Sequence, residues 1–170
     1  MLLPILACGY STIYGDAVGG YAPIKELLKT RVWELSRWRN RAAAAGVGIG
    51  GLRIVGNENG DAGTPLPGGV MIPVSSIEKA PSAELRPWQK DSDSLPEYEL
   101  LDKVLAAHIE HAHGRADLLA DGFDEKTVDT VMRLVDRAEW KRRQYPLGPK
   151  VTALAFGRDR RLPVTNAFRE

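Results

Sequence analysis

Apolar residues recur every three or four positions in three stretches of the chain, which is the pattern of an amphipathic helix. The first stretch, residues 23–41, has Pro23 at its start, where proline suits the first turn of a helix. Its apolar positions are Ile24, Leu27, Leu28, Val32, Leu35 and Trp38. The spacing predicts one helix over the whole stretch, with charged residues on its outer side.

The second stretch begins with Ser94-x-x-Glu97, the pattern of a capping box, with Pro96 near the first turn. It places these apolar residues on one face: Tyr98, Leu101, Val104, Leu105 and Ile109. The third begins near Asp124 and ends near the basic residues before Pro146, which cannot continue a helix. Its expected buried residues are Val128, Val131, Met132 and Val135.

The segments between these helices carry weaker signals. Residues 70–77, VMIPVSSI, predict a short buried strand. Residues 42–69 are rich in glycine and proline and predict an insertion, whose GVGIGG run lacks the strand and helix that a phosphate-binding loop needs. Residues 79–96 are interrupted by prolines and serines, which predicts a lid-like loop.

A short apolar run at the start of the chain ends in Leu6-Ala7-Cys8 and looks superficially like an export leader. No lysine or arginine precedes it, and it is shorter than the roughly 7–15 residues of a leader's apolar core. We therefore expect a buried strand or the end of a helix. No other segment approaches the ~18 apolar residues of a membrane span.

Composition describes an ordinary globular chain: of 170 residues, 44% are hydrophobic and 26% charged, which predicts one domain. The formal net charge of +1 creates no overall field that would attract nucleic acid or an anionic membrane. Cys8 is the sole cysteine and cannot form an internal disulfide, which fits a reducing compartment. We therefore expect a cytoplasmic protein with no membrane partner.

Two patterns in the sequence bear on chemistry independently of any family. His108, His111 and His113 cluster on the second helix, but only the first two share a face, and no further ligand joins them at metal-site spacing. A solvated helix end is the favoured interpretation. The sequence has no G-x-S-x-G elbow or cysteine–histidine arrangement that would support nucleophilic catalysis.

Residues 141–170 carry a marked excess of positive charge, opposed only by Asp159 and Glu170. The cations are Lys141, Arg142, Arg143, Lys150, Arg158, Arg160, Arg161 and Arg169. This basic tail is compatible with a solvated surface, a nucleotide phosphate site or a nucleic-acid contact. Tyr145 and Phe156 are too sparse to form the aromatic platforms that single-stranded nucleic acid prefers, so we expect no nucleic-acid partner.

Three long blocks of the sequence carry a resemblance to a known family. They are GYSTIYGDAVGGYAPIKELLKTRVWELSRW, PSAELRPWQKDSDSLPEYELLD and LVDRAEWKRRQYPLGPKVTALAFGRDRRLPVTNAFRE. Together they resemble the carboxyl-terminal part of the glutamine-dependent NAD synthetases, over about residues 6–40 and 72–170. The resemblance implies that residues 1–170 are the carboxyl-terminal part of a ligase domain. Its fold class would be α/β, adenine-nucleotide alpha-hydrolase-like and Rossmann-like, and mostly helical in this portion.

The resemblance implies a carbon–nitrogen ligase of NAD biosynthesis. In that family, ATP adenylates the carboxylate of deamido-NAD (nicotinic acid adenine dinucleotide), ammonia then displaces AMP, and Mg²⁺ assists by neutralising phosphate charge. ATP and Mg²⁺ are therefore the expected co-substrate and metal, and deamido-NAD the expected substrate. From the residues alone, the alternative is a non-catalytic nucleotide-binding or assembly module.

The resemblance also assigns candidate site residues. Lys29 and Ser82 match ATP-binding positions, and Lys141 matches a lysine that contacts deamido-NAD. The stretch that would line the deamido-NAD site is Tyr10, Ser11, Thr12 and Ile13. Asp16 would lie near it as a catalytic candidate. The residues of the lid-like loop that would help Mg²⁺ or polar substrate groups are Glu84, Asp91 and Asp93, although none is assigned as a certain metal ligand.

Trp140 departs from the family, which usually has histidine or tyrosine beside the lysine. The 170 residues also contain no SGGxDS pyrophosphate loop, no glutamate just before GYST and no glutaminase domain to supply ammonia. We expect this chain alone to be unable to form NAD, because the phosphate cradle provides much of the electrostatic stabilisation. We also expect it to associate with a second copy or with the amino-terminal part of such an enzyme.

Overall fold

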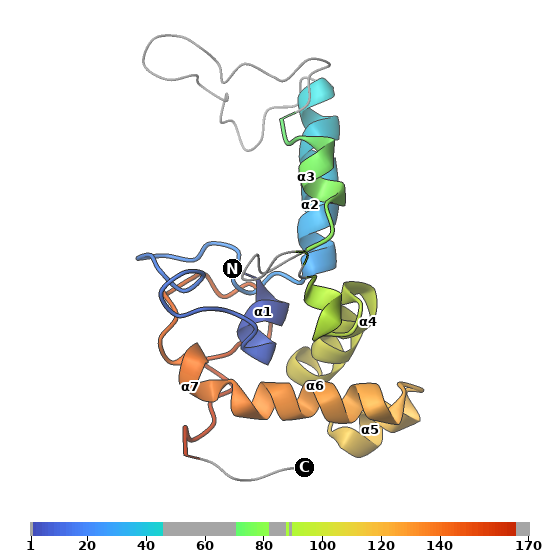
Figure 1. Cartoon of the computed structure of the whole chain (residues 1–170), viewed down its shortest axis with the longest axis vertical. Coiled ribbons are helices and arrows are strands. Elements are labelled where there is room, and N and C mark those ends of the chain that lie inside the picture. Colours follow the sequence, from blue (N-terminus) through green and yellow to red (C-terminus); the bar gives the residue numbers. More distant parts are fainter. Residues whose placement is uncertain (1, 46–70, 82–87, 89, 166–170) are drawn as a thin grey trace. The chain divides into compact units, whose positions relative to one another are not determined.

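The computed structural model describes residues 2–45, 71–81, 88 and 90–165. It contains two compact units, residues 1–30 with 82–170, and residues 31–81. Within the described residues, the chain is helical and has no strand, only the isolated bridges Tyr21–Leu147 and Phe156–Arg160 (Figure 1). The expectation of a mostly helical segment is confirmed, whereas the Rossmann-like class stays a prediction.

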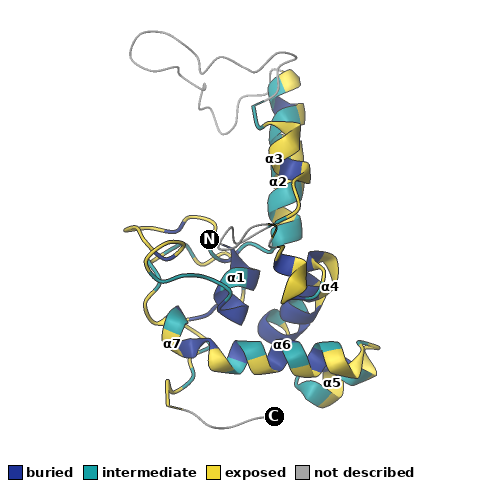
Figure 2. Cartoon of the chain, in the orientation of Figure 1, coloured by how far each residue is buried: buried dark blue, intermediate teal, exposed yellow. Residues whose placement is uncertain are grey.

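The first unit is built around α1 (Leu3–Cys8), which packs against α4 (Tyr98–Leu105), α6 (Glu125–Arg137) and α7 (Glu139–Arg142). A π-helical turn, η2 (Ala106–Glu110), continues α4, and α5 (Arg115–Ala120) packs against α6. The buried faces of these helices meet in one core (Figure 2). Its largest fully buried side chains are Leu101, Leu105, Ile109, Leu118, Val104, Val128, Val131, Val135 and Pro4.

The third predicted helix is confirmed as α6. Asp124 caps it by accepting a hydrogen bond from the Thr127 amide at 3.0 Å, and all four expected apolar residues are buried. The helix ends at Arg137, earlier than predicted. The chain turns at Ala138 and resumes as the four-residue helix α7, which carries the first basic residues of the tail.

The second predicted helix has the expected buried face but a different start. α4 begins at Tyr98, and Glu97 holds the N-cap position without a side-chain bond, so the predicted capping box at Ser94 is wrong. Ser94 instead closes the short 3₁₀ helix η1 (Asp91–Asp93) through a 3.0 Å bond from its amide to the Asp91 carbonyl. Leu95 follows in the core, which delays the start of the helix.

The first predicted helix is shorter than expected, because α2 spans Lys29–Ala44. Residues 23–28 form turns instead. The Leu27 carbonyl accepts the Leu3 amide at 3.0 Å, and the Glu26 carboxylate accepts the amides of Val151 and Thr152 at 2.7 and 3.2 Å. These long-range bonds outweigh the local preference for helix.

In the second unit, the strand predicted at residues 70–77 is wrong, since α3 (Val74–Glu78) is a helix that begins after Pro73. The Asn40 side chain on α2 accepts the amides of Met71 and Ile72 at 3.0 and 2.9 Å and donates to the Ile72 carbonyl at 2.9 Å. The Asn40 side chain therefore makes the hydrogen bonds to the backbone of Met71 and Ile72 that a neighbouring strand would make in a sheet.

Several sequence predictions fall outside the described residues: most of the 42–69 insertion, and Ser82 and Glu84 of the lid-like loop. The apolar run that ends in Cys8, expected to be a buried strand or the end of a helix, forms the helix α1. A search of the described helices finds none with the length and apolar character needed to cross a membrane.

Candidate functional site

The loop that follows α1 lies against α7 and forms the first candidate cluster, called here the loop–lysine cluster (Tyr10–Asp16, Lys141 and Tyr145). Gly9 ends α1 in the left-handed region, at φ 65°, which glycine adopts without strain. Lys141 then donates from Nζ to the carbonyls of Gly9 and Ser11, at 2.7 and 2.8 Å. Residues that the resemblance assigned to one substrate are thus brought together across some 130 positions.

The same cluster contains a tyrosine that the sequence did not assign. The Tyr145 hydroxyl and the Ser11 hydroxyl form a hydrogen bond. Burial raises the pKa of Tyr145, so its phenol is neutral near pH 7. The four predicted residues from Tyr10 to Ile13 are all half-buried, which leaves part of each side chain open to a ligand.

Asp16 is exposed, and the structure shows it bracing the turn. Its Oδ2 accepts the Thr12 amide at 2.9 Å and the Thr12 hydroxyl at 3.1 Å. The carboxylate thereby takes the place of a backbone acceptor for the Thr12 amide. Its catalytic role stays a prediction.

A second cluster, called here the lysine–acid cluster, surrounds Lys29 at the start of α2 and contains Asp91, Tyr98 and Asp102. Asp102 caps α2 from α4, accepting the Thr30 amide on Oδ2 at 2.7 Å. Asp91 accepts the Tyr98 hydroxyl on Oδ2 at 2.7 Å. The Lys29 ammonium lies 6.0 Å from the centroid of the Tyr98 ring.

The electrostatics of the lysine–acid cluster are set by burial. Burial lowers the pKa of Lys29, while the charges of Asp91 and Asp102 act in the opposite direction. Burial also raises the pKa of Asp102, although bonds from Thr30 oppose the shift. Asp91 and Asp102 are 5% and 3% exposed, and each has an Oδ1 with no hydrogen-bond partner among the described residues. The lysine of this cluster therefore stands in acidic surroundings.

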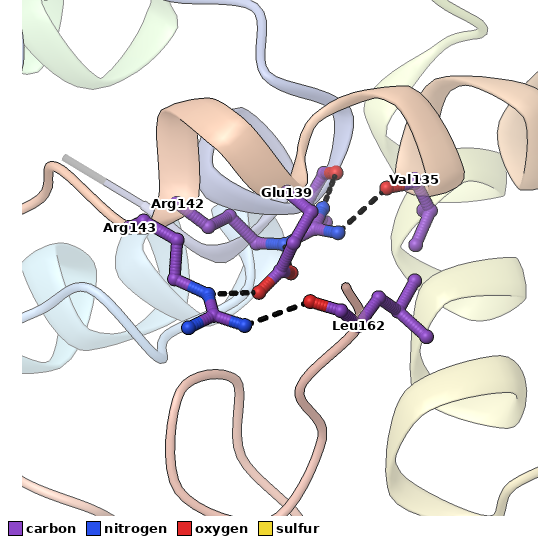
Figure 3. Close-up of polar contacts among 6 residues, drawn as sticks. Val135, Glu139, Arg142, Arg143 and Leu162 are labelled. Carbon is purple, nitrogen blue, oxygen red and sulfur yellow. Dashed lines mark hydrogen bonds and ion pairs between the residues drawn. The ribbon is translucent and has the colours of Figure 1, made fainter. Parts of the chain in front are cut away.

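The basic tail does not behave as a uniformly solvated surface. Arg142 is buried and donates to Glu139 Oε2 at 2.9 Å, to the Ala7 carbonyl at 2.7 Å and to the Val135 carbonyl at 2.7 Å (Figure 3). Arg143 donates to the other Glu139 oxygen at 2.6 Å and to the Leu162 carbonyl at 2.7 Å. These two arginines hold α7 to the core and to the tail.

Arg160 also makes an internal contact, with His108 of η2. It donates to the His108 carbonyl at 2.8 Å and lies 2.6 Å from His108 Nε2, while His108 Nδ1 lies 2.8 Å from the His113 carbonyl. The solvated helix end predicted for the histidines is therefore wrong for His108, which is 4% exposed, and correct for the exposed His111.

Sequence reasoning missed two structural acids, Asp102 of the lysine–acid cluster and Glu139 of α7. Asp102 was overlooked because it sits on the apolar face of α4, at four positions from Tyr98 and three from Leu105. An acid at such a position is itself a signal, since a buried carboxylate needs a partner. Glu139 gave no comparable signal. Its spacing to Arg142 and Arg143, i,i+3 and i,i+4, is the same in the sequence whether the ion pairs are buried or lie on the surface of a helix.

Comparisons with known proteins identify the family of this chain. The sequence profile of the NAD synthase family matches residues 5–145. The chain belongs to the NAD synthase family. Glutamine-dependent NAD(+) synthetases are similar to nearly its whole length: the protein of Acinetobacter baylyi is 44% identical over 96% of the chain, and that of Xanthomonas campestris pv. campestris is 44% identical over 95%. That of Rhodobacter capsulatus is 43% identical over 97%.

This NAD synthase family chain spans about a quarter of the length of these curated relatives, 26%, 25% and 27% respectively. A solved structure of the glutamine-dependent NAD+ synthetase from Acinetobacter baumannii, in complex with ADP, is 37% identical to it. That comparison covers 98% of this chain and 24% of the other, with a TM-score of 0.42.

Membership in the NAD synthase family implies Mg²⁺. The described residues contain no group of three histidine, cysteine, aspartate or glutamate residues that could hold an ion. On the lid-like loop, Asp91 is buried against Tyr98, and Asp93 accepts the Lys90 amide at 2.9 Å. These two residues therefore do not form a magnesium cage.

Proposed function

We propose that this chain takes part in the ATP-dependent amidation of deamido-NAD to NAD, through an adenylated intermediate, as the carboxyl-terminal part of a glutamine-dependent NAD synthetase. The family match over residues 5–145, with relatives of that name at up to 44% identity over 96% of the chain, carries this proposal. The chain would then form part of a Rossmann-like, adenine-nucleotide alpha-hydrolase-like ligase domain.

The loop–lysine cluster is the proposed deamido-NAD site. Lys141 uses two of the three ammonium N–H donors on the carbonyls of Gly9 and Ser11. Its third N–H remains available for an anionic group of the substrate, since no other acceptor contacts it within the described residues. The same two bonds fix the backbone of the loop, so the side chains of Tyr10 to Ile13 are held in position before a ligand arrives.

The lysine–acid cluster is the proposed contribution to the ATP site. Lys29 would bind ATP phosphates as a point charge, together with the hydroxyl of Ser82. Asp91 and Asp102 would keep its ammonium protonated despite burial, because both carboxylates act to raise its pKa. Asp102 would also hold the start of α2, on which Lys29 is carried, through the Thr30 amide.

Ammonia and the remaining phosphate contacts would come from other parts of such an enzyme. The 170 residues contain no SGGxDS loop, so we expect the chain alone to form no NAD from deamido-NAD, ATP, Mg²⁺ and ammonia. Association with a second copy or with an amino-terminal portion stays a prediction. Robust NAD production by the purified chain would contradict this part of the proposal.

Isothermal titration with deamido-NAD tests the proposed substrate site. The unchanged chain should bind saturably, and Lys141→Met should weaken binding by roughly tenfold or more, the effect of losing a charge-assisted hydrogen bond. Lys103→Met is the matched control, because Lys103 is exposed on α4 and lies outside both clusters. Circular dichroism would verify that each variant folds.

The other outcomes of the titration are equally informative. Equal binding by all three proteins would contradict the assignment of Lys141. Absence of binding by a folded chain would contradict the proposed substrate site and favour the non-catalytic module. A Lys29→Met variant titrated with ATP provides the corresponding test of the lysine–acid cluster.

A further inference from the structure

A cavity of about 500 Å³ opens in the first unit between residues 25–26, α7 and the basic tail. This basic cavity is defined by its cationic lining residues, which are Lys25, Arg142, Arg143, Lys150, Arg158 and Arg161. Glu26 is the acidic residue of the lining, and Tyr145 and Leu147 contribute apolar surface. Its volume falls within the roughly 300–1,000 Å³ of small-molecule sites.

The positive charge of this cavity is only partly neutralised. Lys150 pairs with Asp159 at 2.5 Å, and Arg142 and Arg143 share the single carboxylate of Glu139. The remaining two arginines, Arg158 and Arg161, are exposed and make no hydrogen bond or ion pair within the described part of the chain. An uncompensated excess of cations in a concave site favours an anionic ligand.

The walls of the basic cavity are fixed by bonds that do not use its free cations. Glu26 is 5% exposed and accepts from Val151 and from both the amide and the hydroxyl of Thr152, at 2.7, 3.2 and 3.1 Å. Asp159 accepts the Ala155 amide at 2.9 Å, which closes the turn that carries Arg158. A ligand would therefore meet a preorganised site, which reduces the entropy lost on binding.

We propose that the basic cavity is a second anion site, which binds a phosphate-bearing small molecule. It goes beyond the proposed function, because neither Lys141 nor Lys29 lines it, and Tyr145 is the one residue that it shares with the loop–lysine cluster among the described residues. Arginine favours phosphate, since its planar group offers two parallel donors to phosphate oxygens. Extended nucleic acid fits less well, since it needs cations and stacking rings along a groove rather than within one concave site.

Two ligands share this chemistry: a free mono- or diphosphate, and the phosphate end of a nucleotide. They differ in whether the rest of the molecule would contact the apolar wall of the cavity. Tyr145 and Leu147 would contribute binding energy only to a nucleotide, whose base and sugar can cover them. Inorganic pyrophosphate and ADP are therefore the two probes. ADP binding tighter than pyrophosphate identifies a nucleotide site, and equal affinity identifies a site for the phosphate group alone.

Isothermal titration of the full 170-residue chain tests the proposal. Pyrophosphate should bind saturably, and the double variant Arg158→Ala/Arg161→Ala should weaken its affinity by roughly tenfold or more. The control Lys103→Ala/Arg137→Ala removes the same charge from α4 and α6, outside the cavity, and should stay within about twofold of the unchanged chain. Circular dichroism would confirm folding of each protein.

Three results would overturn the proposal. One is the absence of saturable binding of either probe by the folded chain. Another is an equal loss in the Arg158→Ala/Arg161→Ala variant and its control, which would indicate only a general charge effect. A third is binding that survives the double substitution but is lost in Lys29→Met, which would place the phosphate in the lysine–acid cluster.

Discussion

Glu139 offers a direct test of how burial sets the strength of an ion pair in this fold. Its carboxylate is 4% exposed and bonds to Arg142, whose side chain is 3% exposed, and to Arg143 (Figure 3). Glu139→Gln would leave the Arg142 charge buried without a counter-ion. Breaking a buried pair in this way costs about 3–5 kcal/mol. The two carbonyls that Arg142 also contacts favour the lower end, about 3 kcal/mol.

The matched control is Glu125→Gln on α6. Glu125 pairs with Arg115 at 2.6 Å, the same distance as between Glu139 and Arg143, but its side chain is 70% exposed. Urea unfolding, followed by far-ultraviolet circular dichroism and tryptophan fluorescence, would give the free energy of unfolding of each variant. Glu139→Gln should lose a large part of the roughly 5–15 kcal/mol of a typical domain, and Glu125→Gln little. Similar losses in both variants would refute the argument from burial.

Three further predictions concern other buried groups. Gly9→Ala should lose about 1–3 kcal/mol in urea unfolding, because φ is 65° and the new Cβ would lie 2.8 Å from that of Ala138. Gly122→Ala, at φ 90° with nothing within 4 Å, should lose less, and equal losses would contradict the steric cause. Burial raises the pKa of Asp102 above its ordinary value of 3.8, so ionisation of this carboxylate destabilises the folded state as pH rises from that value. The stability of Asp102→Asn relative to the unchanged chain should therefore increase as pH rises above 3.8. A difference independent of pH would exclude this linkage. Burial raises the pKa of Cys8 to about 12, so a thiol reagent should modify it only after unfolding, and rapid reaction in native buffer would show that it is accessible.

The parts of the fold that the sequence predicts are those in which local and long-range preferences agree. In α6, the cap at Asp124 and the apolar spacing both point to the helix that forms. At residues 23–28 they disagree, because Glu26 and Leu27 bond to distant backbone groups. At α3, β-branched residues predict a strand, but Asn40 satisfies the backbone that precedes the helix. Such tertiary effects are invisible to spacing alone.

The candidate site is predictable to a similar extent. The resemblance brought Ser11 and Lys141 together across the sequence, and the structure joins them by a hydrogen bond. Charge counting, in contrast, treated the basic residues as equivalent, whereas Arg142 is an internal crosslink and Arg158 faces a cavity. Burial separates these roles, and burial depends on the packing of α1 against α7.

The bond from Arg142 to the Ala7 carbonyl joins residues 135 positions apart. A ribosome adds roughly 5–20 residues per second, so α1 would leave it some 7–27 seconds before its partner in α7 is made. During that interval the apolar residues of α1 lack part of their native cover. The order of synthesis therefore predicts a transient need for chaperone protection. A circularly permuted chain, in which α1 and α7 are close in sequence, would not have this need.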